Sequence, residues 1–314
     1  MVRLFAILLV LLFGVALVAA PASGRVPQAD PPESSEYAAA QAEASRWLAR
    51  SRDHLAAGET ESALASAQRA IALAPRRPET HLMLANAYRA RIAGSGAYRQ
   101  LILARQIREA LQAAVALESV GAEAHLALMR FHLRAPALVG GSRREAGKLA
   151  DIIVQRDPVR GALALGLLAQ SEGDAELALA QFERADLRAP AAGPLRRLVV
   201  DLLGQSLEQS GRWRAAGVLY AQSVDADPDF AEGWFGLGRV AAETGDHLPQ
   251  GIAALERYLA LPHQAGQPAA EEAHYLLGSI YLQLAHADQA RAQFRLALAL
   301  DPQHAEAHRA LEAL

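Results

Sequence analysis

The sequence predicts an all-α fold built from repeated pairs of helices. Alanine, the strongest helix former, accounts for 71 of the 314 residues, whereas Val, Ile and Thr, which favour strands, together number only 27. Alanine-rich runs such as ALASAQRAIALAP end repeatedly at a proline, and apolar residues recur within them at i, i+3, i+4 and i+7. That spacing places the apolar residues on one face of a helix, and proline prevents the helix from continuing.

The first 43 residues are predicted to be an export signal and a linker. Arg3 gives a positive start, residues 4–20 carry no charge, and small residues follow. This order is typical of a secretory signal peptide, so we expect a signal peptide over residues 1–22 and a periplasmic protein. The alternative is an uncleaved inner-membrane anchor, because about 17 apolar residues is the lower edge of a spanning length. Residues 23–43 begin with a stretch rich in Pro, Ser and charge, which predicts a flexible linker.

From residue 44 to residue 314 the pattern indicates one repeating unit of helix, turn and helix. A second helical segment precedes each alanine-rich run, and Gly or a small polar residue separates the two, as at Gly58 and Gly211. The prolines that end the units are Pro75, Pro158, Pro190, Pro228 and Pro302.

This unit resembles the tetratricopeptide repeat, a 34-residue helix pair with the pattern W-x2-L-G-x2-Y, then A-x3-F-x2-A, then P. The clearest copy covers residues 271–304, with these signature residues in step: Leu277, Gly278, Tyr281, Ala290, Phe294, Ala297 and Pro302. Gly or Ala at the eighth position lets the two helix backbones approach closely. The resemblance implies about seven repeats that stack into a right-handed superhelical solenoid, with first helices lining a concave groove. Residues 305–314 are predicted to form a C-terminal capping helix.

Two insertions interrupt the regular spacing. Residues 91–98 lengthen the second repeat, and residues 135–142 (APALVGGS) separate the helices of the third. The second insertion resembles an A-P-x3-G-G-S segment of uncharacterised bacterial envelope proteins with tetratricopeptide repeats, a resemblance that implies no known chemistry. Loops carry function more often than helices do, so four loop residues are candidates for a site: Tyr98, Pro136, Gly140 and Gly141. The alternative is a purely structural role, in which the loop only redirects the chain between two helices and Ser142 caps the second of them.

The sequence carries no signature of common catalytic or metal sites. It has no cysteine and no H-E-x-x-H, G-x-S-x-G or G-x-x-x-x-G-K-S/T string. Residues at the fourth repeat position are predicted to pack between helices: Trp47, His81, His125, Trp234, His274 and His308. His304 and His308 have the i, i+4 spacing of two metal ligands, but no third ligand is predicted beside them. We therefore expect no metal, no cofactor and no enzymatic activity.

The predicted function is a non-catalytic scaffold or adaptor in the bacterial cell envelope that binds a protein or peptide. A net charge of −3 with interspersed signs argues against a nucleic-acid partner, and membrane contact is expected only if the N-terminal segment stays uncleaved. The predicted groove-facing residues are Asn86, Arg130, Gln205, Phe235, Arg239 and Tyr275. The alternative is a small-molecule-binding or enzyme-associated subunit, with a site near residues 91–98 and 135–142.

Overall fold

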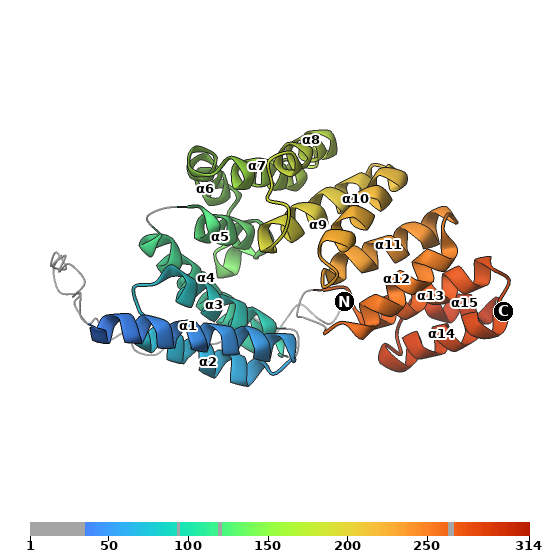
Figure 1. Cartoon of the computed structure of the whole chain (residues 1–314), viewed down its shortest axis with the longest axis horizontal. Coiled ribbons are helices and arrows are strands. Elements are labelled where there is room, and N and C mark those ends of the chain that lie inside the picture. The colour runs from blue at the N-terminus through green and yellow to red at the C-terminus, as the bar shows by residue number, and fades with distance from the viewer. Residues whose placement is uncertain (1–34, 93–94, 119–120, 263–266) are drawn as a thin grey trace, which may run out of the picture. The chain divides into compact units, whose positions relative to one another are not determined.

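A computed structural model describes residues 35–92, 95–118, 121–262 and 267–314, and all regular structure in these ranges is helical (Figure 1). One short 3-10 helix, η1 (Ala137–Val139), accompanies the α-helices. The α-helices are α1 (Ser35–Ala56), α2 (Thr60–Leu73), α3 (Pro78–Ala90), α4 (Ala97–Leu117), α5 (Glu123–Arg134), α6 (Arg143–Arg156), α7 (Pro158–Glu172), α8 (Ala175–Asp186), α9 (Pro194–Gln209), α10 (Trp213–Ala226), α11 (Ala231–Thr244), α12 (Leu248–Ala260), α13 (Ala270–Gln283), α14 (Ala287–Leu300) and α15 (Ala305–Glu312). The predicted all-α fold is confirmed.

Helices pair in chain order, so that each repeat is a hairpin of a first and a second helix (Figure 1). The pairs run from α3 with α4 to α13 with α14, and α1 joins α2 through apolar packing that includes Leu48 and Leu64. First helices of neighbouring repeats also contact one another. The contacting pairs are α5 with α7, α9 with α11 and α11 with α13. The described residues thus form a solenoid of seven hairpins, and α15 packs on α14 after the last of them.

Glycine at the eighth repeat position allows the two helices of a hairpin to touch. A Cβ atom on Gly278 would lie 2.4 Å from the Phe294 ring, and one on Gly166 would lie 2.4 Å from the Phe182 ring. Both phenylalanine side chains are fully buried. A larger residue at either glycine would therefore separate the helix backbones or displace the ring.

Three side chains at the fourth repeat position bond a carbonyl group at the end of the preceding repeat. The indole Nε1–H of Trp234 donates to the carbonyl oxygen of Pro228, at 2.9 Å. The Nε2 atoms of His81 and His308 bond the proline carbonyl six residues earlier, at 2.8 and 3.0 Å. A carbonyl oxygen only accepts, so in both histidines Nε2 carries the proton. These residues satisfy carbonyl groups at helix ends, in agreement with the packing role predicted for them.

The N-terminal helix begins earlier than the sequence predicted. The linker was expected to reach residue 43, but α1 begins at Ser35, because alanine-rich residues 38–44 favour helix strongly. The predicted signal peptide, the linker up to residue 34 and residues 93–94 of the first insertion lie outside the described residues. None of the described helices is both long enough and apolar enough to cross a membrane.

Candidate functional site

The structure separates the predicted groove residues into groups. Asn86 on α3 and Arg130 on α5 both line one cavity. Gln205 on α9 and Arg239 on α11 lie near a buried carboxylate cluster, described below. Tyr275 on α13 belongs to a third, aromatic contact further along the chain.

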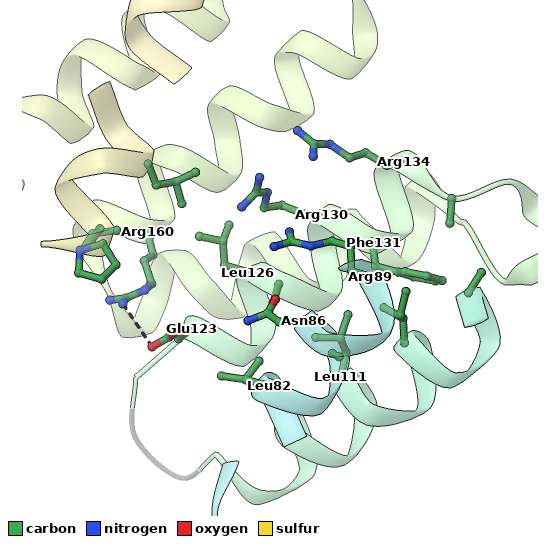
Figure 2. A pocket seen from close by; sticks show the side chains of 18 of the residues that line it. Leu82, Asn86, Arg89, Leu111, Glu123, Leu126, Arg130, Phe131, Arg134 and Arg160 are labelled. Atoms are coloured by element: carbon green, nitrogen blue, oxygen red, sulfur yellow. Dashed lines mark ion pairs between the residues drawn. The ribbon is translucent and has the colours of Figure 1, made fainter. Parts of the chain in front are cut away.

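The cavity has a volume of about 740 Å³ and is lined by parts of four repeats (Figure 2). Its walls come from α3, α4, α5, α7 and α9, and from the loops that follow α5 and α8. Most of the lining is apolar, and includes Leu82, Ile92, Leu111, Leu126, Phe131 and Leu198. The volume falls within the range of about 300–1,000 Å³ typical of small-molecule sites.

Three arginines point their guanidinium groups toward the same side of this cavity (Figure 2). Arg89 and Arg134 are exposed at its mouth, whereas Arg130 is half-buried. Within the described part of the chain none of the three forms an ion pair, and Nε of Arg130 is buried without a hydrogen-bond partner. Burial, together with the charges of Arg134 and Arg89, lowers the pKa of Arg130 to about 10. The Asp201 carboxylate on α9 acts in the opposite direction, but among the described residues no carboxylate lies within ion-pair distance of these three guanidinium groups.

Arg89 and Arg134 were not among the residues predicted from the sequence. Their positions carry a usable signal, because Arg89 follows Asn86 by three residues and Arg134 follows Arg130 by four. Residues at those spacings share one face of a helix. A fourth arginine at the cavity, Arg160, differs from these because it forms ion pairs within the protein.

The charge of Arg160 is neutralised by two carboxylates. Its guanidinium lies 2.6 Å from Asp157. It also lies 3.8 Å from Glu123, and Figure 2 marks this second ion pair with a dashed line. Asp157 also caps the start of α7, accepting hydrogen bonds from the backbone N–H groups of Val159 and Arg160. Arg160 therefore stabilises the wall of the cavity rather than adding free positive charge.

The second group surrounds a buried carboxylate. Glu208 on α9 pairs with Arg239 at 2.6 Å and accepts a hydrogen bond from the hydroxyl of Tyr220 at 3.0 Å. Burial raises the pKa of Glu208 above its usual value, although Arg239 and Tyr220 act in the opposite direction. Nearby, Gln205 donates to Asp201 at 2.6 Å, and burial raises the pKa of that carboxyl as well. The charge of Arg239 is thus engaged within the protein.

The two aromatic residues predicted to face the groove, Phe235 and Tyr275, lie against neighbouring aromatic side chains. Phe235 is only 3% exposed and packs edge-on against Tyr258, so it offers almost no surface to a partner. Tyr275 is half-buried and lies against Phe294 and the ring of His304. Large side chains fill the space between successive repeats, which explains why Phe235 faces the core.

The second insertion is a tightly constrained turn at the edge of the cavity. Gly140 has φ of +100°, and a Cβ on Gly141 would lie 1.7 Å from the carbonyl oxygen of Ala135. Ser142 accepts a hydrogen bond from the backbone N–H of Glu145 and caps α6, as the structural alternative predicted. Pro136 nevertheless lines the cavity, so the loop also contributes to the candidate site. Tyr98 does not line it and is 79% exposed on α4.

The remaining buried histidines have structural partners. His125 lies 2.6 Å from Glu118, which also accepts a hydrogen bond from the backbone N–H of Ala124 at the start of α5. His304 caps α15 through Nδ1, which accepts from the backbone N–H of Ala307. Across the described ranges no group of three or more His, Asp or Glu side chains is arranged to hold a metal ion.

Comparisons with known proteins identify the repeat. Sequence models of the tetratricopeptide repeat match residues 202–261 and 271–304. No curated protein matches the sequence. The crystal structure of the APC/C hetero-tetramer Cut9–Hcn1 is similar over 85% of this chain, with 14% identity and a TM-score of 0.58. This chain spans 48% of the length of that one, so the similarity concerns the fold alone.

Two further structures are more distantly similar. YrrB, described as a TPR protein with an unusual peptide-binding site, covers 66% of this chain over its full length, with 18% identity and a TM-score of 0.47. A tetratricopeptide repeat protein from Parabacteroides merdae covers 86% of this chain over 98% of its own length, with 14% identity and a TM-score of 0.43. The two sequence matches show that this chain contains tetratricopeptide repeats over residues 202–261 and 271–304, and the other described helices continue the same run of stacked hairpins.

Proposed function

We propose that this protein is a non-catalytic scaffold that binds a protein or peptide partner through the surface of its first helices. Tetratricopeptide repeats present extended surfaces that suit such binding. The supporting observation is that first helices of neighbouring repeats contact one another, so α9, α11 and α13 make one continuous layer. Gln205, Arg239 and Tyr275 keep part of their side chains exposed on this layer.

Site-specific photo-cross-linking tests this surface with a matched pair of positions in one repeat. Gln205 stands on the first helix α9, and Gln222 is exposed on the second helix α10. A photoreactive amino acid is introduced at each position in turn, and adducts formed in cells are identified by mass spectrometry. We expect a partner adduct from position 205 and none from position 222. Adducts from position 222 alone would contradict the proposed surface.

We further propose that the protein acts in the bacterial cell envelope after export. The support is the order of charged, apolar and small residues over residues 1–22. Mass spectrometry of the protein isolated from cell fractions should show a chain that begins at Ser23 in the periplasmic fraction. An intact Met1 in the membrane fraction would favour an uncleaved anchor over residues 4–20.

A further inference from the structure

The cavity lined by the second to fifth repeats combines two properties that protein interiors rarely combine. Its walls are mostly leucine, isoleucine and phenylalanine side chains, yet Arg89, Arg130 and Arg134 bring three positive charges to one side of it. Burying the Arg130 guanidinium next to apolar surface is unfavourable, because its Nε has no hydrogen-bond partner and the nearby Asp201 carboxylate forms no ion pair with it. A ligand that carries negative charge on an apolar body would satisfy both properties.

We propose that this cavity binds an organic phosphate ester with an apolar chain or ring. The phosphate would accept hydrogen bonds from Arg89, Arg130 and Arg134, and the apolar part would lie against Leu82, Leu126 and Phe131. Guanidinium groups suit phosphate because their planar donors bind two oxygens at once. The cavity shares α9 with the proposed partner surface on α9, α11 and α13, but the arginines that carry this proposal lie on α3 and α5.

The number of arginines favours phosphate over a single carboxylate. A phosphate monoester carries close to two negative charges at neutral pH and offers three acceptor oxygens, whereas one carboxylate would leave two of the three arginines unneutralised. The like charges of Arg89 and Arg134 also act on Arg130, and a dianion would offset this repulsion. The volume of about 740 Å³ suits a small molecule better than a long peptide segment.

Isothermal titration calorimetry of the purified chain with n-octyl phosphate tests the proposal. We expect saturable binding, and binding at least tenfold weaker for both inorganic phosphate and n-octyl glucoside, because each lacks one of the two ligand features. Equal binding of octyl phosphate and octyl glucoside would overturn the proposal, since the arginines would then contribute nothing. Absence of binding by octyl phosphate would also overturn it.

Arginine variants assign the binding to this cavity. Arg130→Met keeps an unbranched apolar side chain and removes the guanidinium charge, and we expect at least tenfold weaker binding of octyl phosphate. Arg144→Met is the control, because the Arg144 side chain is 83% exposed on α6 and lies outside the cavity. Arg134→Met changes a residue at the exposed mouth and provides a second test if Arg130→Met fails to fold. Unchanged affinity in a folded Arg130→Met or Arg134→Met protein would overturn the proposal.

Two further probes test whether the phosphate ester is a lipid or a soluble molecule, and whether an acidic peptide occupies the cavity instead. Co-sedimentation with vesicles of phosphatidylcholine and phosphatidic acid, lost in Arg130→Met, would support a lipid as the source of the phosphate. Octyl phosphate binding without co-sedimentation would support a soluble ester. An acetylated hexapeptide of alternating leucine and glutamate represents an acidic peptide. If it binds more tightly than octyl phosphate and this binding requires Arg130, the site is a peptide site and the proposal is wrong.

Discussion

Replacing Arg239 by methionine should destabilise the protein, because it leaves the carboxylate of Glu208 without its ion-pair partner. The Glu208 side chain is 8% exposed and lies 2.6 Å from Arg239, whose own side chain is 29% exposed. Breaking a buried ion pair by removing one partner costs about 3–5 kcal/mol. Solvent reaches the arginine, and the Tyr220 hydroxyl still donates to Glu208, so we expect a loss of about 2–3 kcal/mol in the free energy of unfolding.

Urea denaturation followed by far-UV circular dichroism measures this loss, and two comparisons test its cause. Methionine retains packing near the Phe235 ring, which the Arg239 guanidinium approaches at 5.4 Å from the centroid. The double variant Arg239→Met with Glu208→Gln should therefore return to within about 1 kcal/mol of the natural protein, because no buried charge remains. A double variant as unstable as Arg239→Met alone would refute the reasoning.

The free energy of unfolding of the single variant Arg239→Met should depend on pH in a characteristic way. Loss of Arg239 removes an influence that lowers the pKa of Glu208, so that pKa rises further in the folded state. A group with a raised folded-state pKa stabilises the fold when protonated and loses that contribution as the pH rises. The deficit of Arg239→Met relative to the natural protein should therefore shrink as the pH falls from about 7 to about 5. A deficit that stays constant over this interval would mean that Glu208 is not its cause.

Other changes test packing and capping. Gly278→Ala places a Cβ 2.4 Å from the Phe294 ring and should cost about 1–3 kcal/mol in urea titrations. Gly147→Ala meets no atom within 4 Å on helix α6 and should instead stabilise by about 0.5–1 kcal/mol. Phe294→Ala empties a fully buried site and should cost about 3–5 kcal/mol, visible as a lower melting temperature. Asp157→Ala removes the cap of α7 and should cost about 1 kcal/mol near neutral pH. Burial alone would raise the pKa of Asp157, but hydrogen bonds from Arg160 hold it below 3.8, so this cost should vanish as the pH falls through the lowered pKa.

The hairpin repeat could be predicted because its determinants are local in sequence. Gly278 precedes Phe294 by 16 residues, and Gly166 precedes Phe182 by the same interval, so one repeat contains both halves of each contact. The capping of α6 by Ser142 is also local, because it involves the backbone N–H of Glu145, three residues later. These features depend on short-range sterics and hydrogen bonds, which a sequence pattern records directly.

The cavity, and which of the groove residues form ion pairs, could not be predicted in the same way. Whether Arg130 remains unpaired depends on which carboxylates α7 and α9 bring near it, and those helices belong to later repeats. Arg239 stands at the same repeat position as Arg130, yet Glu208 on the preceding first helix neutralises it. Equivalent positions thus acquire different chemistry from their neighbours in space, and a repeat pattern contains no record of those neighbours.

The bonds from the fourth repeat position have a consequence for how the chain folds. The bonds of His81, Trp234 and His308 each span only six residues, and the substantial contacts among the described helices join helices that are adjacent or next but one along the chain. These helices therefore pair without closing a long loop, and proteins rich in such local contacts fold fast. Structure can begin in any hairpin and spread to its neighbours, as expected for a linear array. Amide hydrogens of the terminal hairpins should accordingly exchange with solvent before those of the middle ones, because an end repeat has a neighbour on one side only.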